Sequence, residues 1–401
     1  MDKPIKIAVL GTGTAGVMGL ATLLSGCPPI YEIYSVHDPK TPILGIGEST
    51  TIAGPTALWF GARFTIMSDA DKLDATLKTG VRYKGWRKHD IDSHIPPPHI
   101  AMHFNNFKIK EVCFERFKEL WVGRFHEIIG NVQDIDNGKD SAKLHMENGE
   151  VLEFDYVMDC RGYPTDYTDY NDALIPVNHC LVNMVPKPGD WNWTEHVAHR
   201  NGWMFGIPLQ TRQGWGYLYN DKITEREDAI DDIAERFKTS PQDLNLREFT
   251  FKNYYAKKFI EGRVIKNGNR ALFFEPLEAL SGTFYNHVTQ YVLAYLSGQN
   301  TEDEINDILT NIAQDIEWFI SYIYHGGSTY NSKFWDITKT KCSDFLQSNI
   351  RFNQFMTEMR MMPTYEKQQG YLHSVFPTSN WRKFDRDFGY NYWTDPNEPP
   401  I

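Results

Sequence analysis

The stretch that decides the fold spans residues 5–16 and reads IKIAVLGTGTAG. A short apolar run with β character enters a Gly-x-Gly-x-x-Gly turn, and residues 17–24 continue with helical character. This order of strand, glycine turn and helix predicts a dinucleotide-binding unit. Gly11 permits the tight turn, Gly13 lets a pyrophosphate approach the backbone, and Gly16 lets the helix pack on the strand.

The residues around this turn support the same interpretation. The N–H groups of the helix start, which includes Thr14 and Ala15, would hold the phosphates at the positive end of the helix dipole. A second apolar run at residues 30–36 leads to Asp38, 22 residues beyond Gly16. A carboxylate at that distance can accept hydrogen bonds from a ribose. The structural alternative is a glycine-rich surface turn.

Composition narrows the class of protein. A chain of 401 residues can bury a large core, and its length suggests two or three structural units. The net charge of −11 argues against a nucleic-acid partner, which needs a basic face. The five cysteines form no C-x-x-C pair, so we expect no zinc site and no disulfide framework. No signal peptide or membrane-spanning apolar run is present, so we expect a cytoplasmic protein without a membrane partner.

Two early segments contain candidate functional groups. Residues 45–51 read GIGESTT, in which Gly47 gives backbone freedom and Ser49 and Thr50 give hydroxyl groups beside Glu48. A plain loop ending in a helix cap fits this segment equally well. Lys78 lies where a helical piece is expected to end near Gly80 and a β-like run begins. It could point into a cavity there, although a solvated surface lysine is the commoner case.

Residues 91–107 are expected to form a loop with histidines at positions 94, 99 and 103. Their spacing fits no standard zinc motif, so we expect no metal site. We interpret the segment as an aromatic-bearing lid over a pocket, with His99, His103 and Phe104 as candidates to stack on a substrate. A β-rich stretch should follow around residues 121–122 and 143–146, with a turn at residues 148–149.

The middle of the chain predicts more sheet. Residues 156–162 read YVMDCRG, which predicts a strand that returns to the first sheet and turns at Gly162 after Asp159. An ordinary strand-end turn is as compatible. Residues 175–220 predict an antiparallel sheet, in which Trp203 and Phe205 alternate onto one face and Ile207 and Pro208 follow. An aromatic ladder that only fills the core is the structural alternative.

The later segments predict helices and a second dense motif. Thr224 and Glu227 suggest a capping box that starts a helix, as do Thr301 and Glu304 before apolar residues that recur every 3.6 positions up to residue 323. Residues 267–282 read NGNRALFFEPLEALSG. Free N–H groups near its last two residues would make a small anion site, although an acidic helix N-terminus explains the pattern as well.

Together these stretches resemble the flavin-dependent halogenases of the tryptophan halogenase family. Residues 11–16 resemble its FAD fingerprint, GIGEST its Gly-Val-Gly-Glu-(Ala/Ser)-Thr signature, DCRG its second flavin segment, and residues 268–278 the stretch ending in Glu-Pro-Leu-Glu. Lys78 resembles the catalytic lysine in position, and the segment from residue 316 to 335 is also similar.

The resemblance implies a role for each group of residues. Lys78 and Glu278 are implied to be catalytic. The implied FAD-binding residues are Gly11, Gly13, Thr14, Ala15, Gly16, Asp38, Gly47, Glu48, Ser49, Thr50, Asp159, Gly162, Gly268 and Phe273. The implied halide residues are Ser281 and Gly282, and the implied substrate residues are His99, His103, Phe104 and Glu275. The implied barrier between flavin and substrate consists of Trp203, Phe205, Ile207 and Pro208.

The sequence departs from the family pattern at several points. The family's Trp-x-Trp-x-Ile-Pro appears as WMFGIP, with Phe205 in place of the second tryptophan. After the glutamate, most members have Ser-Thr-Gly, whereas this chain has Ala-Leu-Ser-Gly, one residue longer. Arg270 and Leu272 replace small residues near the flavin. The chain is also shorter than tryptophan-specific members, and in this it looks closest to phage-encoded halogenases.

The resemblance implies an α/β fold: a FAD-binding Rossmann-like domain of the flavin monooxygenase type, an antiparallel β-sheet substrate region and C-terminal helices. The expected core is residues 1–300, with flavin segments at about 1–60, 150–165 and 262–300 and the substrate sheet at about 75–125 and 175–255. Residues 301–401 are expected to be a helical region packed on that core.

The implied reaction uses FADH2 from a separate flavin reductase, oxygen and a halide to form hypohalous acid, which halogenates an indole or phenol. We rank bromide and iodide above chloride, because softer halides lose electrons more easily and the longer loop gives a roomier anion site. A homo-oligomer is compatible with the sequence. Two alternatives stay open: an FAD-dependent aromatic hydroxylase, which would need neither Lys78 nor Glu278, and a non-catalytic flavin-binding protein.

Overall fold

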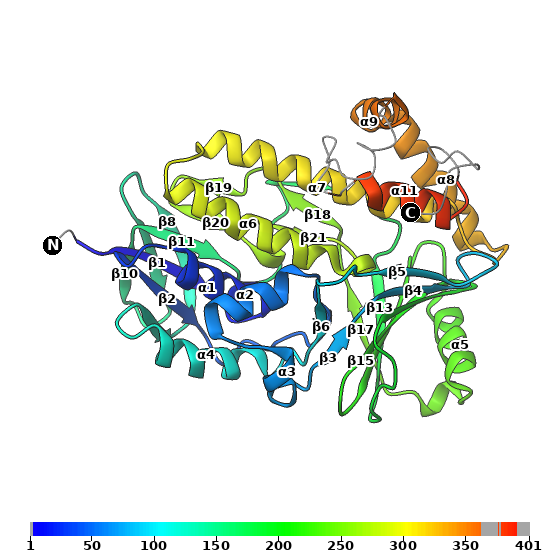
Figure 1. Cartoon of the computed structure of the whole chain (residues 1–401), viewed down its shortest axis with the longest axis horizontal. Helices are drawn as coiled ribbons and strands as arrows, with labels where there is room; N and C mark the ends of the chain where they lie inside the picture. The colour runs from blue at the N-terminus through cyan, green and yellow to red at the C-terminus, as the bar shows by residue number, and fades with distance from the viewer. Residues whose placement is uncertain (1–2, 362–375, 377, 391–401) are drawn as a thin grey trace.

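A computed structural model describes residues 3–361, 376 and 378–390 (Figure 1). The first of its two large β-sheets has six strands in the order β19-β20-β11-β1-β2-β7 and is parallel except for the β19–β20 pair. The bounds of these strands are β1 Ile5–Leu10, β2 Tyr31–His37, β7 Phe125–Ile129, β11 Tyr156–Asp159, β19 Ile260–Glu261 and β20 Val264–Lys266. The predicted strand at residues 156–159 therefore returns to the first sheet beside β1, as expected.

The central strand of this sheet is buried on both faces. Ile7 and Val9 belong to the main core, whereas Ala8 and Leu10 belong to a second cluster, because successive side chains of a strand point to opposite faces. Helices cover the first face, and a three-stranded antiparallel sheet covers the second. The covering elements are α1 Thr14–Gly26, α2 Ala53–Ala62, α4 Ile109–Leu120 and α6 Leu280–Leu296 on one side and β8 Val132–Asn137, β9 Ala142–Met146 and β10 Val151–Phe154 on the other.

The second large β-sheet has seven strands in the order β17-β13-β16-β15-β14-β4-β5 and is antiparallel except where β14 pairs with β4. Its strands are β4 Gly80–Lys84, β5 Ile91–His94, β13 His179–Val185, β14 Thr194–His199, β15 Gly202–Pro208, β16 Gln213–Tyr219 and β17 Leu246–Thr250. The antiparallel sheet predicted for residues 175–220 is confirmed. Trp203 and Phe205 face the main core, while Met204 between them packs against α5, Arg226–Phe237, on the other face.

Smaller elements lie between and around the two large sheets. Figure 1 shows β3 and β6 in the middle of the molecule, between the two large sheets, and α8, α9 and α11 together at the carboxyl-terminal end. The remaining strands are β3 Thr76–Lys78, β6 Ala101–His103, β12 Tyr170–Asp172, β18 Tyr254–Ala256 and β21 Leu272–Phe273. The remaining helices, four of them short 3-10 turns marked η, are α3 Ile66–Asp69, η1 Ala70–Leu73, η2 Pro241–Asp243, η3 Gly268–Arg270, η4 Leu277–Ala279, α7 Glu302–Tyr324, α8 Lys333–Ser348, α9 Ile350–Met361 and α11 Thr378–Asp387.

Local predictions differ in outcome. The capping box of Thr301 and Glu304 is confirmed at the start of α7. The capping box at Thr224 is wrong, because its hydroxyl donates instead to the carbonyl of Asn201 and the helix begins at Arg226 without a side-chain cap. The helical piece expected to end near Gly80 is also wrong, since β3 occupies that segment. The predicted β-rich stretch is confirmed as β7, β8 and β9, although it begins at Phe125, because residues 121–122 form the turn after α4.

Among the described residues, no helix combines the length and the apolar character that crossing a bilayer requires.

Candidate active site

The glycine turn after β1 has the geometry of a phosphate cradle. Gly11 adopts a φ of +90°, and a Cβ on Gly16 would lie 2.1 Å from the carbonyl oxygen of Gly11, so both positions require glycine. By contrast, a Cβ on Gly13 would meet no atom within 4 Å. Gly13 is the N-cap of α1, and no side chain caps that helix end. The N–H groups of the first turn, which begins at Thr14 and Ala15, thus have no side-chain cap beside the open space at Gly13, an arrangement that fits a pyrophosphate.

Residues from distant segments surround this turn. A Cβ on Gly268, which has a φ of +60°, would lie 2.7 Å from the Ala15 side chain, so η3 packs tightly on the start of α1. Gly162 has a φ of +86° and open space where a side chain would be. Asp38 follows the end of β2, and one of its oxygens accepts the backbone N–H of Lys40 at 2.9 Å. Asp38 and Gly162 therefore follow the carboxyl ends of β2 and β11, the two strands that pair with β1 on either side of the glycine turn.

Asp159 and Phe273, also predicted to bind the flavin, are held by protein partners. Burial acts to raise the pKa of Asp159, but Arg161 and Arg270 outweigh it and hold that pKa below its usual value. Arg161 donates to both carboxylate oxygens at 2.9 Å, and Arg270 lies 3.3 Å from one of them. Phe273 lies in β21 and makes an edge contact with Tyr163.

The GIGEST segment links the glycine turn to Lys78. Glu48 is 2% exposed and accepts hydrogen bonds from Arg212 at 2.5 Å and from the backbone of Asn106 at 3.1 Å. The Asn106 side chain in turn accepts the Thr14 hydroxyl, at 3.1 Å. Gly47 has a φ of +76° and open space around its Cβ position.

Lys78 is buried and has fixed partners. Its side chain is the last of β3 and is 3% exposed. Its Nζ donates to the Ser49 hydroxyl and to the Thr50 carbonyl, both at 3.0 Å. Burial lowers the pKa of Lys78 to about 8, although the charge of Glu278 acts in the opposite direction. Lys78 is therefore a buried lysine. The alternative, a surface lysine exposed to solvent, is wrong.

Glu278 lies close enough to Lys78 for each charge to act on the other's pKa. Burial raises the pKa of Glu278, and a hydrogen bond from Tyr83 and the charges of Lys78 and Lys383 oppose that rise. The Tyr83 hydroxyl donates to its Oε1. Glu278 and Ala279 have left-handed backbones, with φ values of 59° and 58°, immediately before α6. Two consecutive left-handed residues thus form the turn into α6.

Glu275 belongs to a separate, buried series of hydrogen bonds. The carboxylate is 0% exposed, and its Oε2 accepts the Tyr324 hydroxyl at 2.8 Å. The same hydroxyl accepts the indole N–H of Trp203 at 2.5 Å. Burial raises the pKa of Glu275 to about 8, so the group is largely protonated at neutral pH. Glu275 thus contacts the predicted barrier, in which Trp203, Phe205 and Ile207 are all less than 5% exposed and are followed by Pro208 at the end of β15.

The predicted halide residues lie in the first turn of α6. Ser281 donates its hydroxyl to the carbonyl of Phe274 at 3.2 Å, so that hydroxyl has a protein acceptor. Gly282 has open space where a side chain would be. The helix start carries no side-chain cap.

The lid interpretation of residues 91–107 is wrong for two of its three aromatic candidates. His103 belongs to β6 and is fully buried, with its imidazole near the hydroxyls of Thr76 and Thr194, at 3.2 and 2.9 Å. Phe104 is 0% exposed in the main core. Only His99 lies at the surface. Alternating apolar residues 100, 102 and 104 would have indicated a strand here, and the prolines at 96–98 obscured it.

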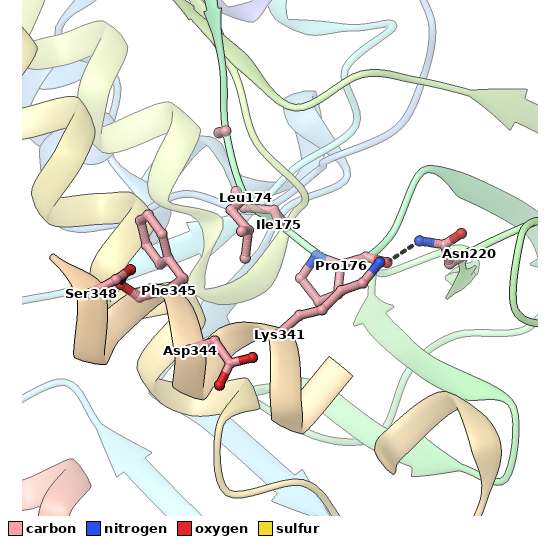
Figure 2. Close-up of a pocket in the computed structure, with 9 residues that line it drawn as sticks. Leu174, Ile175, Pro176, Asn220, Lys341, Asp344, Phe345 and Ser348 are labelled. Carbon is pink, nitrogen blue, oxygen red and sulfur yellow. Dashed lines mark hydrogen bonds between the residues drawn. The ribbon is translucent and has the colours of Figure 1, made fainter. Parts of the chain in front are cut away.

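In the described ranges 3–361, 376 and 378–390, no three His, Cys, Asp or Glu side chains are arranged to hold a metal ion. A pocket between α8 and the chain after β12 lies elsewhere in the molecule (Figure 2). It is lined by Leu174, Ile175, Lys341 and Phe345, among others, and by none of the predicted site residues.

Sequence comparison decides the family. A model of the family described as tryptophan halogenase matches residues 6–126 and 91–385 of this chain. The chain belongs to the tryptophan halogenase family. The assignment makes it a flavoprotein and an FADH2-dependent enzyme of the oxidoreductase class.

Individual members of the family are distant in sequence. Tryptophan 7-halogenase RebH of Lentzea aerocolonigenes is 20% identical, over 86% of this chain and 81% of that protein. Tryptophan 6-halogenase ThaL of Streptomyces albogriseolus is 21% identical, over 87% of this chain and 82% of that protein.

Solved structures show the same fold. A tryptophan halogenase from Shewanella frigidimarina has a TM-score of 0.79 at 16% identity, covering 100% of this chain and 91% of its own. The flavin-dependent halogenase BrvH from Brevundimonas sp. has a TM-score of 0.77 at 18% identity, covering 97% and 91%. At these identities the likeness concerns the fold, and the halogenase fold predicted from the sequence is confirmed.

Sequence reasoning missed the partners that hold these groups in place. Tyr83, Tyr324 and Arg212 contact Glu278, Glu275 and Glu48 respectively, and none stands in a recognisable motif. Tyr83 could have been suspected, because it lies in the β-like run that follows the lysine. The other two meet their carboxylates only through the tertiary fold.

Proposed function

We propose that this chain uses FADH2, oxygen and a halide to halogenate an electron-rich aromatic substrate of the indole or phenol type. The observation that carries the proposal is the coupling of Lys78, buried in β3, with Glu278, half-buried in η4, since the charge of each acts on the pKa of the other. A hydroxylase that transfers oxygen directly has no use for this pair. The family assignment and the names of its tryptophan-halogenating members support the same reaction class.

The flavin would lie along the open backbone at Gly13, Gly47 and Gly162. When bound and reduced, it would supply the two electrons that activate oxygen, and the activated oxygen would be the oxidant that converts a halide into hypohalous acid. The α1 N-terminus would neutralise the pyrophosphate with its uncapped N–H groups. Trp203 and Phe205, on the core face of β15, would keep the organic substrate away from the flavin and keep hypohalous acid out of bulk water.

Lys78 would then activate the halogen. With a pKa of about 8 the group is mostly an ammonium at neutral pH, which can hydrogen-bond hypohalous acid, and it deprotonates readily enough to form a haloamine. Either route makes the halogen more electrophilic. Glu278 would stabilise the cationic ring intermediate and accept the ring proton as a general base. Ser49 and Thr50 would aim the ammonium group.

Further parts of the proposal follow from the sequence. A separate flavin reductase supplies FADH2, the Gly282 backbone holds the halide, and bromide and iodide are preferred over chloride. The flavin core comprises residues 1–300 in discontinuous segments, and residues 301–401 form the C-terminal region.

The test is a reaction with reductase-supplied FADH2, oxygen, equal chloride, bromide and iodide, and a panel of indoles and phenols, followed by mass spectrometry. We expect halogenated products with the wild type and at least a ~10³-fold loss with Lys78→Ala. Lys84→Ala is the matched control, because Lys84 pairs with Glu195 on the next strand, away from Glu278. Oxygenated products that persist in Lys78→Ala would instead support the hydroxylase.

A further inference from the structure

Tyr83 is a buried phenol whose hydroxyl meets the proposed base. It lies in β4, is 0% exposed, and donates to Oε1 of Glu278. Aromatic rings enclose it: His196, Phe388 and Trp86 make edge contacts at centroid distances of 5.1, 5.3 and 5.6 Å. This packing fixes the position of the ring, and hence of its hydroxyl.

Glu278 needs such a partner because its backbone is not held by regular structure. The residue has a φ of 59° within η4, a left-handed conformation that costs a non-glycine residue about 1–2 kcal/mol. A carboxylate that removes a proton must be oriented within hydrogen-bond reach of that proton. The hydrogen bond from Tyr83 fixes one of its two oxygens.

We propose that Tyr83 is a positioning residue, which fixes Oε1 of Glu278 and thereby presents Oε2 to the proton of the aromatic substrate. This inference rests on the proposed function and adds a residue to it. Tyr83 acts only as a donor, since burial and the neighbouring Glu278 raise its pKa well above the usual value of 10.

The charged groups around Glu278 determine how removal of the Tyr83 hydroxyl changes the ionisation of Glu278. Lys78 in β3 and Lys383 in α11 favour the carboxylate, as does the Tyr83 hydrogen bond. Glu275 and Tyr390 lie near Tyr83 and oppose ionisation of the phenol. His196 in β14 is neutral, because burial lowers its pKa well below 6.5. Tyr83→Phe removes one of three influences that favour the charged carboxylate and leaves both lysines in place.

The experiment compares Tyr83→Phe with Tyr217→Phe. Tyr217 is an equally buried phenol whose hydroxyl donates to Asp232, between β16 and α5, outside the proposed site. For this experiment the whole chain is labelled with ¹³C at the glutamate side-chain carboxyls. The signal that is present in the wild-type NMR spectrum and absent in Glu278→Gln is then assigned to Glu278. We expect Tyr83→Phe to move the titration midpoint of that signal upward by ~1–2 pH units, and Tyr217→Phe to leave it in place.

Activity gives the second readout. In Tyr83→Phe we expect kcat to fall ~10–100-fold at neutral pH with little change in KM, and to recover in part as the pH rises past the shifted midpoint. An unchanged Glu278 titration in Tyr83→Phe, or an equal shift in Tyr217→Phe, would overturn the proposal. If the wild type halogenates nothing, the proposed function fails, while the NMR titration still shows whether Tyr83 controls this carboxylate.

Discussion

The glycine turn beside α1 and the Lys78–Glu278 centre are built in opposite ways. The turn is a contiguous piece of backbone, and its proposed role in binding a pyrophosphate depends on the absence of a side chain at Gly13 and of a side-chain cap on the helix. The centre consists of side chains from β3, β4, η4 and α11, which lie far apart in the sequence and meet only through the tertiary fold. One site is open and polar through its backbone, whereas the other is buried and polar through ionisable groups.

This difference explains how each site responds to change. A backbone cradle tolerates almost any side-chain substitution around it but no added Cβ at its contact points. A buried cluster of charges depends instead on the balance between desolvation and pairing, so each member sets the ionisation of the others. The two sites should therefore be separable by mutation.

The largest expected effect on stability comes from Gly16→Ala. Its Cβ would lie 2.1 Å from the Gly11 carbonyl oxygen, so α1 must move away from β1, at a cost of ~3 kcal/mol or more in the free energy of unfolding. Gly13→Ala has room for its methyl group and should change stability by less than about 1 kcal/mol. It should nevertheless weaken FAD binding at least ~10-fold, because the methyl group fills the cradle.

Chemical denaturation and flavin fluorescence titration measure both quantities. Tight FAD binding by Gly13→Ala would contradict the cradle, and a fully stable Gly16→Ala would contradict the close contact.

A smaller effect concerns how the free energy of unfolding depends on pH. This dependence comes from Lys78 in the buried centre and not from the glycine turn. The folded protein releases the Lys78 proton near its pKa of about 8, whereas the unfolded chain keeps it up to about 10.5. Between these values the unfolded state binds more protons, so stability rises with pH. The rise is absent in Lys78→Met, and the two free energies of unfolding should diverge by ~3 kcal/mol over that window. Urea unfolding at pH 7.5, 9 and 10.5 tests this, and parallel curves would show that Lys78 is not desolvated.

The same contrast explains what the sequence could predict. The turn at Gly11–Gly16, the strand at residues 156–159 and the long helix α7 depend on local pattern, and each lies where it was expected. Lys78 and Glu278 were identified through family motifs. Their partner Tyr83 was not, because a hydrogen bond between β4 and η4 joins residues 195 positions apart and depends on the tertiary fold.

The failed predictions also have a physical cause. Thr224 has the sequence of a helix cap, but its hydroxyl finds the Asn201 carbonyl, a tertiary partner that no local rule contains. His103 and Phe104 follow a triple proline and were expected in a lid, yet β6 pairs with β3 and buries them. Short strands of three residues carry too little periodicity to outweigh such local features.

The smallest expected effect tests the strained loop that joins the two regions. Ala279 has a φ of 58°, where glycine is unstrained, so Ala279→Gly should raise the free energy of unfolding by ~0.5–1 kcal/mol. Lys238→Gly is the matched control, since Lys238 has a φ of 52° at the end of α5, remote from Glu278. If the Tyr83 hydroxyl holds the carboxylate, kcat should stay within about twofold in both variants even though the backbone beside Glu278 has become freer. A large loss of kcat in Ala279→Gly alone would mean that the left-handed loop, and not Tyr83, orients Glu278.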